Sequence, residues 1–282
     1  MPNINWYPGH MARSRRLLQD QLRAVDAVIE LCDARAPLAT RNSDLGQLTR
    51  DKARILILNK ADLADDQATS RWLEYFRREG LTALRFNSNG GKVRDILDRI
   101  QQATRPVAER YKARGVKKTI RMMVIGIPNV GKSTFINRIY GGSIVKAADR
   151  PGVTRSNTWV KLGAYQEIMD TPGMLPPRMD DQENARLLAY LGSIRDQIMD
   201  TEALAGELLE RLYALQPGAV CARYKLSLSE ENPPSHRLLE EACRGRGWLL
   251  SGGRYDTERA AAVVLDEYRG GKIGKITLQP LP

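Results

Sequence analysis

Residues 122–133 read MMVIGIPNVGKS, an apolar run that passes directly into a glycine-rich loop. The loop, from Gly126 to Ser133, satisfies the pattern G-x-x-x-x-G-K-[ST], and Thr134–Tyr140 after it has helical spacing. In a strand, loop and helix of this kind, glycines let backbone N–H groups close around phosphate oxygens, and the helix N-terminus adds a favourable dipole. The sequence therefore predicts a cradle for the phosphates of a nucleotide.

The residue types of this loop predict separate tasks for its side chains. Lys132 is expected to place a positive charge on the β- and γ-phosphates, which makes it a candidate for both binding and catalysis. Ser133 offers a hydroxyl ligand to Mg²⁺. The other loop residues expected to contact the nucleotide are Asn129, Val130, Gly131 and Thr134.

A second phosphate-sensing motif follows the loop in the sequence. Residues 165–173, YQEIMDTPG, read as a core strand ending in D-x-x-G, in which Asp170 holds Mg²⁺ through water and the Gly173 N–H senses the γ-phosphate. Alone, D-x-x-G also describes an ordinary Asp turn, but its distance from the loop favours a nucleotide site. Between the two motifs, Thr154 is the expected switch threonine that closes on Mg²⁺, with Thr158 as a neighbouring alternative.

Recognition of the base is predicted from residues that come earlier in the chain. Residues 59–62, NKAD, follow an apolar strand, and N-K-x-D offers a carboxylate for the guanine N1–H and amine and an amide for the other edge. The same pattern also occurs as a helix-capping turn. Here a serine-containing loop after Phe86 accompanies it and is expected to reach the guanine carbonyl. The expected base-site residues are Asn59, Lys60, Asp62, Asn87, Ser88 and Asn89.

The order of these motifs is reversed relative to the common small GTPases, in which the phosphate loop comes first. Strand-like runs at 27–31, 54–58, 83–86, 120–125 and 165–169 alternate with helical stretches, which predicts a mostly parallel sheet with helices on both faces. The expected fold class is thus α/β, a circularly permuted P-loop GTPase domain. A basic surface linker at 105–119 is expected to join the original ends of that domain.

The character of the chain changes after about residue 178, so we expect a GTPase domain at 1–178 and a small all-α domain at 179–282. Helices are predicted at 184–198, 201–215, 236–244 and 257–268, with breaks at 216–218 and 232–234. Because the domain directly follows the D-x-x-G motif, nucleotide state is expected to move it.

The composition of the 282 residues is that of an ordinary globular protein, with 42% apolar and 27% charged residues. No run is long and apolar enough to cross a bilayer, and the start has no apolar signal core. A cytoplasmic protein without membrane contact is therefore expected. We also expect a monomer. Three cysteines without metal-type pairing fit reduced packing thiols.

The net charge of +11 favours a polyanionic partner. The excess lies in the first two thirds, where residues 1–189 hold 32 Lys and Arg against 20 Asp and Glu, while residues 190–282 hold 12 against 13. One basic cluster comprises Arg13, Arg15 and Arg16; the other comprises Arg105, Arg110, Lys112, Arg114, Lys117, Lys118 and Arg121. A solvated charged face explains either cluster as well as a binding surface does.

Together these motifs resemble a known family. N-K-A-D, G-I-P-N-V-G-K-S, P-G-V-T and D-T-P-G in this order, preceded by WYPGHM (6–11) and DARAP (33–37) and followed by YRGGKIG (268–274), closely resemble the bacterial ribosome biogenesis GTPase A family of circularly permuted GTPases. The resemblance covers nearly the whole chain. It implies GTP hydrolysis during late assembly of the large (50S) ribosomal subunit, stimulated by the ribosomal particle, with precursor rRNA and ribosomal proteins as partners and the helical domain touching rRNA.

The resemblance also bears on the catalytic step. Many GTPases place a water-orienting glutamine after D-x-x-G, whereas this chain has Met174, whose thioether cannot polarise water. The family assigns that role to the histidine of its W-[FY]-P-G-H-M motif, here His10, although a surface or packing histidine is the plainer interpretation. Asn129 matches the asparagine with which potassium-stimulated relatives hold K⁺. The expected cofactors are therefore GTP or GDP, Mg²⁺ and K⁺.

Two rival interpretations stay open at this stage. One is a potassium-type GTPase acting on tRNA or in metal transport, which shares the P-N-V-G-K-S loop but not the permuted order. The other is an RNA-binding scaffold in which GTP only stabilises the fold. In the near-neutral C-terminal domain, rRNA contact would depend on local patches such as Arg244, Arg246, Lys272 and Lys275, and a protein-binding domain is the alternative.

Overall fold

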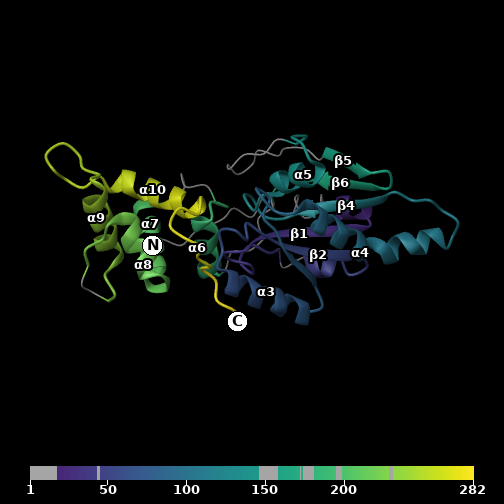
Figure 1. The fold of residues 1–282 in the computed structure, drawn as a ribbon, viewed down its shortest axis with the longest axis horizontal. Coiled ribbons are helices and arrows are strands. Elements are labelled where there is room, and N and C mark those ends of the chain that lie inside the picture. The colour runs from purple at the N-terminus through teal and green to yellow at the C-terminus, as the bar shows by residue number, and fades with distance from the viewer. Residues whose placement is uncertain are drawn as a thin grey trace.

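The computed structural model describes residues 18–42, 45–145, 158–171, 173, 181–194, 199–228 and 231–282. Within these residues a six-stranded sheet has the order β3-β2-β1-β4-β6-β5 (Figure 1). The strands are β1 (Ala27–Asp33), β2 (Ala53–Asn59), β3 (Thr82–Arg85), β4 (Ile120–Ile125), β5 (Thr158–Gly163) and β6 (Gln166–Asp170). All neighbouring pairs are parallel except β5 with β6. The predicted α/β class with a mostly parallel sheet is confirmed.

The central strands are mostly apolar on both faces because helices cover both. All seven residues of β1 are buried, which is typical of a strand enclosed in a parallel sheet. On one face, Ile29 and Ile57 pack with Phe135 of α5 (Lys132–Tyr140). α4 (Val93–Lys112) adds Ile96 and Ile100 to the same face.

The alternate side chains of the strands point to the opposite face. There Leu56 and Leu58 pack against Trp72 and Phe76 of α3 (Asp66–Arg78). Helical residues 18–23 and the short α2 (Leu45–Leu48) cover the rest of this face. The two layers of helices leave the carboxyl ends of the parallel strands as the open edge of the sheet.

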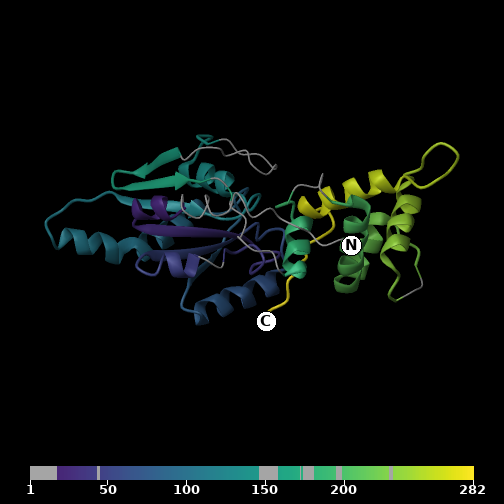
Figure 2. The ribbon, with the colours of Figure 1, turned by 180° about the vertical axis from the view of Figure 1, so that it is seen from behind.

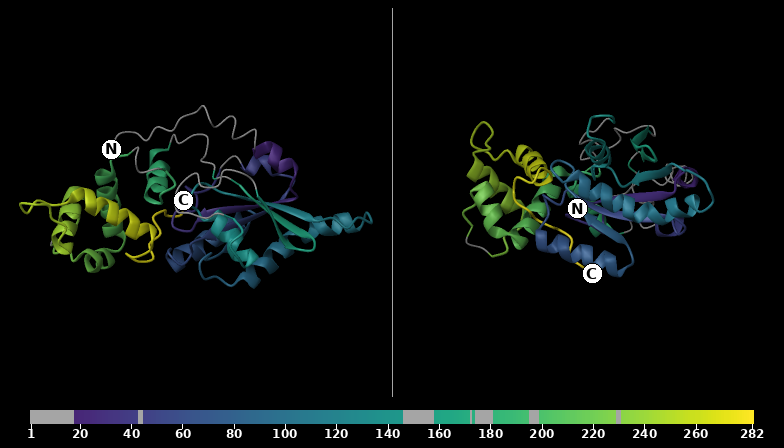
Figure 3. Two further views of the ribbon diagram at one scale, coloured as in Figure 1. Left: turned by 90° about the horizontal axis from the view of Figure 1, so that it is seen from above. Right: turned by 45° about the vertical axis from the view of Figure 1, so that its right-hand side comes forward.

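The C-terminal region is helical and lies at one end of the sheet (Figures 2 and 3). Its helices are α6 (Gln182–Tyr190), α7 (Thr201–Leu215), α8 (Pro217–Tyr224), α9 (Ser235–Arg246) and α10 (Thr257–Arg269). They share one hydrophobic cluster, in which Leu208 and Leu212 of α7 pack among Leu238, Val264 and Tyr268. The apolar stripe of α7 is thus enclosed by its neighbours.

The expected linker at 105–119 is wrong for its first half, because α4 continues to Lys112. Past Thr104 its residues are largely exposed, and they lack the apolar stripe that identifies a packed helix. Ala, Glu, Arg and Lys nevertheless have high helix propensity, and the basic residues Arg110 and Lys112 of the last turn complement the helix dipole. Only residues 113–119 connect α4 to β4 without regular structure.

Three further differences concern helix ends and an edge strand. The helix predicted over 184–198 ends at Tyr190, since Gly192 adopts a left-handed φ of 70°. Pro217, taken as part of a break, instead begins α8, where a proline at the first helical position loses no hydrogen bond. The antiparallel strand β5 was not predicted; it pairs along β6 at the edge of the sheet.

The last residues of the chain return from the helical region to the sheet region. Leu278 N–H donates to the Arg35 carbonyl at 2.8 Å. The Gln279 side chain accepts from the N–H groups of Leu38 and Ala39 at 2.7 and 3.0 Å, and Trp72 Nε1 donates to the Gln279 carbonyl at 3.3 Å. This C-terminal strap ties both regions together. No helix among the described residues has the length and apolar character to span a membrane.

Candidate nucleotide-binding site

The phosphate loop is shaped by two residues with left-handed backbone conformations. Asn129 has a φ of 64° and Gly131 a φ of 93°, and α5 begins at the next residue, Lys132. A Cβ atom at Gly131 would lie 2.5 Å from Asn59 Nδ2, so this position requires glycine for space as well as for φ. The turn aims the N-terminus of α5, where the first N–H groups have no acceptor within the helix, at the carboxyl edge of the sheet.

Lys132 is buried in the loop that it belongs to. Its exposed fraction is 7%, and its Nζ donates to the Ile127 carbonyl at 2.9 Å. Burial lowers the pKa of the ammonium to about 8, although the nearby Asp170 carboxylate opposes the shift. A buried cation with so little compensation is suited to the charge of a triphosphate.

Asp170, at the end of β6, lies directly beside the loop. Ser133 Oγ donates to its Oδ2 at 2.9 Å, whereas its buried Oδ1 has no hydrogen-bond partner. Burial raises the pKa of this carboxyl, against the opposing effects of Ser133 and Lys132. An orphaned carboxylate oxygen next to a serine hydroxyl is the oxygen chemistry that Mg²⁺ prefers, so the residues fit this ion.

Gly173 approaches the phosphate loop closely. A Cβ added there would lie 2.8 Å from Pro128 Cα and 3.0 Å from Lys132 Nζ, so only glycine fits without a shift. The D-x-x-G and phosphate-loop motifs therefore meet in space. Thr171, the second residue of the D-x-x-G motif, donates from its hydroxyl to the Val124 carbonyl at 2.6 Å and holds the end of β6 against β4.

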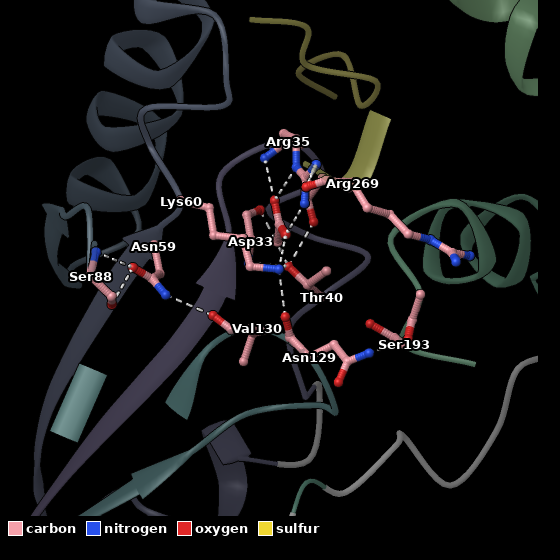
Figure 4. Close-up of polar contacts among 12 residues, drawn as sticks. Asp33, Arg35, Thr40, Asn59, Lys60, Ser88, Asn129, Val130, Ser193 and Arg269 are labelled. Atoms are coloured by element: carbon pink, nitrogen blue, oxygen red, sulfur yellow. Dashed lines mark hydrogen bonds and ion pairs between the residues drawn. The ribbon is translucent and has the colours of Figure 1, made fainter. Parts of the chain in front are cut away.

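The two base-recognition segments converge on the same loop despite their earlier place in the chain. Asn59 Nδ2 donates to the Val130 carbonyl at 2.8 Å, and Asn59 Oδ1 accepts from Ser88 Oγ at 2.7 Å and from Ser88 N–H at 3.2 Å (Figure 4). Ala61 N–H donates to the Phe86 carbonyl at 3.2 Å. The Asn59 amide thus braces three loops together, while the half-buried Asp62 follows two residues later in the same turn.

The loop that follows β3 has a turn of its own. Asn87 Oδ1 accepts from the N–H groups of Asn89 and Gly90 at 2.8 and 3.2 Å, an Asx turn that fixes the backbone next to Ser88. Ser88 itself is buried, whereas Asn89 is exposed. The geometry therefore presents backbone rather than the Ser88 side chain to a ligand.

A buried ion pair lies at the end of β1, next to the phosphate and base loops. Asp33, at the end of β1, accepts from Arg35 Nε at 2.9 Å and from Arg35 Nη2 at 2.8 Å, and Lys60 Nζ lies 3.3 Å from Asp33 Oδ2 (Figure 4). Burial alone would raise the pKa of Asp33, but the charges of Arg35 and Lys60 prevail and hold it well below the usual range. Lys60 also donates to the Asn129 carbonyl at 2.6 Å.

These contacts continue into the helical region. Arg35 Nη1 donates to the carbonyls of Tyr268 and Arg269 at the end of α10, at 2.9 and 3.2 Å. Arg269 in turn donates to the carbonyls of Ala189 and Tyr190 at the end of α6, at 2.9 and 3.1 Å. Both arginines lie where terminal helix carbonyls lack intrahelical partners.

The residues just after α6 form hydrogen bonds with the phosphate loop. Asn129 Nδ2 donates to the Gly192 carbonyl at 2.6 Å, and Ser193 Oγ donates to the Pro128 carbonyl at 2.9 Å. Sequence reasoning missed Gly192 and Ser193, which belong to no quoted motif, and it assigned no role to Arg269 of the quoted stretch YRGGKIG. Arg35 belonged to a quoted motif, DARAP, but nothing in its spacing indicated that it contacts α10.

The structure brings together most of the predicted site residues. Val130 is buried and Thr134 is half-buried in the first turn of α5. His10 and Thr154, like Met174, lie outside the described residues. Within the described part of the chain, no group of three or more His, Cys, Asp or Glu side chains is placed to hold a metal ion, so a cation here would depend on phosphate and water oxygens as well.

Comparisons with known proteins agree with this geometry. Residues 121–205 match the model of a family described as 50S ribosome-binding GTPase. A curated relative from Bacillus cereus, named ribosome biogenesis GTPase A, is 38% identical over 98% of this chain and 93% of its own length. A relative of the same name from Priestia megaterium is 39% identical over 97% of this chain and 96% of its own length.

Solved structures are similar over the same span. The GDP-bound structure of a protein called TM YlqF has a TM-score of 0.70 and 26% identity, and covers 94% of this chain and 98% of that one. The GNP-bound crystal structure of YlqF from T. maritima has a TM-score of 0.66 and 25% identity, over 95% and 97% of the two chains. On this evidence the chain is a GTPase and belongs to the ribosome biogenesis GTPase A family.

Proposed function

We propose that this protein hydrolyses GTP to GDP and phosphate during late assembly of the large (50S) ribosomal subunit, and that the ribosomal particle stimulates the reaction. The observation that carries the proposal is the meeting of two motif pairs at one edge of the sheet. The phosphate-loop Ser133 bonds to Asp170, and the base-side Asn59 bonds to Val130. The names of the full-length relatives supply the biological setting.

In the proposed complex, each cluster has one task. Lys132 and the backbone from Asn129 to Thr134 hold the phosphates, and Gly173 reports the γ-phosphate through its N–H. Asp62 accepts hydrogen bonds from guanine, while Asn59 and Ser88 fix the loops around the base and Lys60 supports them from Asp33. The contributing loop residues are Asn87, Asn89, Val130 and Gly131.

A divalent cation fits beside the loop. When bound, Mg²⁺ neutralises charge on the β- and γ-phosphate oxygens. Ser133 would hold it directly and Asp170 through water, with Thr154 joining from the switch segment. Asn129 is proposed to hold K⁺ with its amide oxygen.

We assign the ordering of the attacking water to His10. In a neutral imidazole one ring nitrogen carries a lone pair that accepts a hydrogen bond from water. Met174 lacks any group for this task. Lys132 contributes charge stabilisation at the transferring phosphoryl group.

The division into a GTPase domain at 1–178 and a helical domain at 179–282 is part of the proposal. The hydrophobic cluster built mainly from α6 to α10, which Ala36 and Ala39 join from the sheet region, supports it. Asn129 of the phosphate loop bonds to Gly192 just after α6, Arg269 bonds to the end of α6, and Arg35 bonds to the end of α10. Through this chain of hydrogen bonds, nucleotide binding at the phosphate loop would shift the helical domain. We propose that the protein works as a cytoplasmic monomer in contact with precursor rRNA and ribosomal proteins.

A single-turnover assay tests the function. We expect GTP to bind at least 100-fold more tightly than ATP, in line with about 3 kcal/mol from charge-assisted contacts to guanine. We also expect purified large subunits to accelerate GTP hydrolysis at low salt. Equal uptake of ATP would overturn the site assignment, and GTP hydrolysis indifferent to subunits would favour the scaffold interpretation.

A further inference from the structure

A pocket of about 1000 Å³ lies at the amino edge of the sheet, where β4 and β6 begin. It is bounded by α4 from Asp98 to Lys112, the connection 116–118 and the β5–β6 turn around Tyr165. The nucleotide site lies at the carboxyl ends of the same strands, so the pocket is separate from it. α4 and the connection after it occupy the end of the molecule away from α7 to α10 (Figures 1 and 3).

The charge of the pocket wall is strongly positive. Its charged residues are Asp98, Arg105, Lys112, Lys117 and Lys118. Lys118 forms an ion pair with Asp26, and Arg105 with Glu109. No described acidic side chain forms an ion pair with Lys112 or Lys117, and both are exposed. These two ammonium groups are therefore available to replace the counterions of a polyanion.

The remaining surface of the pocket is apolar and aromatic. Tyr165 is 55% exposed and Val116 is 49% exposed, and both line the same space. The Tyr165 backbone is fixed, because its carbonyl accepts from Ile120 N–H at 2.9 Å, so the turn that carries the ring is anchored to β4. An exposed tyrosine ring on an anchored turn that lines a basic pocket offers a stacking platform for a base. Gln101, Gln102 and Gln166 add amide donors and acceptors around it.

We infer that this pocket binds a segment of single-stranded RNA, with Lys112 and Lys117 on its phosphates and one base on the Tyr165 ring. The volume accommodates a nucleotide. A double-stranded segment keeps its bases stacked inside the helix and cannot place one on Tyr165. An acidic peptide would satisfy the lysines, but an exposed tyrosine beside phosphate-binding cations is the arrangement on which nucleic-acid bases stack. The inference rests on the proposed ribosomal function and specifies one surface through which it operates.

The first experiment measures RNA affinity by fluorescence anisotropy. The probe is a fluorescein-labelled single-stranded RNA of ten nucleotides and mixed sequence, titrated with the full chain in Mg²⁺ and GDP. For K112E/K117E we expect binding weakened at least ten-fold, with the slope of log affinity against log salt reduced by about 1.4, from two lost phosphate contacts. R71E/R77E, which makes the same charge change on the exposed side of α3, is the matched control and should stay within two-fold.

The aromatic contact has its own pair of variants. Loss of one stacked base costs roughly ten-fold in affinity, so Y165A should weaken binding by about that factor. Y165F keeps the ring and should bind like the unchanged protein. If Y165A and Y165F behave alike, the stacking assignment is wrong. If the control R71E/R77E loses as much affinity as K112E/K117E, binding is general electrostatics and the pocket has no special part in it.

Crosslinking locates the RNA independently of affinity. A 4-thiouridine version of the same probe should crosslink to residues within 105–118 or to Tyr165. Crosslinks confined to other segments would overturn the inference even if affinities changed as expected.

A parallel assay with purified large subunits separates this inference from the proposed function. If subunits fail to accelerate hydrolysis by the unchanged protein, the proposed function fails. If they accelerate the unchanged protein while K112E/K117E binds the RNA probe normally, only the pocket assignment fails. If K112E/K117E keeps RNA affinity but loses stimulation by subunits, the surface contacts a protein, which excludes RNA as its partner.

Discussion

Asn129 Nδ2 donates a hydrogen bond of 2.6 Å to the carbonyl oxygen of Gly192, which joins the phosphate loop to the residues after α6. The left-handed backbone of Asn129 permits this while its own carbonyl accepts from Lys60. One loop residue therefore contacts both the base-recognition segment and the helical region. The bond to Gly192 uses the amide nitrogen, whereas the K⁺ site proposed above would use the amide oxygen.

Replacement of Asn129 by glycine should remove potassium dependence. Glycine adopts a φ of 64° without strain, so the variant removes the side chain and leaves the loop shape. We expect the unchanged protein to hydrolyse GTP faster in K⁺ than in Na⁺, and Asn129→Gly to be slow and equal in both. Ser193→Ala, which loses only the bond to Pro128, should keep the preference for K⁺. Equal rates of the unchanged protein in the two salts would remove the K⁺ assignment.

Asp62→Asn should change the base that is recognised. An amide can donate to the C2 carbonyl of xanthine but cannot accept from both guanine donors. We expect GTP affinity to fall about 10- to 100-fold, in line with roughly 1.5–3 kcal/mol for a charged hydrogen bond, and XTP affinity to rise. Fluorescent-nucleotide competition measures both. Asp65→Asn is the control. Because Asp65 caps α3 by accepting from Ala68 N–H, this substitution should leave GTP affinity unchanged. A variant Asp62→Asn that still prefers GTP would contradict the base assignment.

Nucleotide binding should take up a proton in mildly alkaline solution. Because burial lowers the pKa of Lys132 to about 8, most of this side chain is neutral at pH 8.5 in the free protein. A bound triphosphate favours the charged form, so about three quarters of a proton should be taken up per GDP or GTP at pH 8.5, and little at pH 7. Calorimetry in two buffers of different ionisation enthalpy measures the uptake. Proton release on binding would have the wrong sign for this account.

The lowered pKa of Lys132 also predicts how the folding stability of the nucleotide-free protein depends on pH. Since the folded pKa of Lys132 lies below the unfolded value of 10.5, the folded chain binds fewer protons than the unfolded chain between these values. The unfavourable burial of the charge is fully present below pH 8 and is relieved as the pH rises toward 10.5. Lys132→Met should therefore gain the most stability, relative to the unchanged protein, below pH 8.

Arg35→Met should destabilise the fold strongly. The Arg35 side chain is completely buried and its Asp33 partner is 2% exposed, so the variant leaves a buried carboxylate with Lys60 as its remaining cation. Removal of one partner of such a pair costs about 3–5 kcal/mol, and it also removes the Arg35 hydrogen bonds to the Tyr268 and Arg269 carbonyls at the end of α10. Urea unfolding followed by tryptophan fluorescence measures the loss. Arg85→Met, which breaks the exposed pair with Asp66, is the control and should change the midpoint little.

His10→Ala should impair hydrolysis without changing GTP affinity. Loss of a residue that orders the attacking water lowers the rate by roughly 100- to 10,000-fold, whereas it leaves the contacts to guanine and phosphate in place. Single-turnover rates with large subunits and equilibrium binding of a fluorescent nucleotide separate the two effects. His236, exposed in the first turn of α9, is the only other histidine, so His236→Ala is a matched control. Equal rates for both variants would remove His10 from the catalytic site.

The differences between expectation and structure have local causes. Residues 105–112 were predicted to be part of a linker because the stretch 105–119 is rich in positive charge and poor in apolar residues, yet they extend α4. An exposed helix needs no apolar stripe, so hydrophobic periodicity cannot detect it. Pro217 was interpreted as a break although proline is well suited to the first helical position. In both cases the residue types are compatible with more than one structure, and the sequence pattern alone does not distinguish an exposed helix or a helix start from a loop.

By itself, the sequence determined the α/β class, the five parallel strands and the motifs of the nucleotide site, because these depend on short-range patterns: apolar runs, glycine spacing and the order of residue types. Only the tertiary structure decided which loops meet. Asn59 bonds Val130 across 71 residues, Asn129 bonds Gly192 across 63, and Arg35 bonds Tyr268 across 233. Such bonds join polar groups whose partners are chosen by the packing of the elements that carry them, and a linear pattern holds no information on that packing.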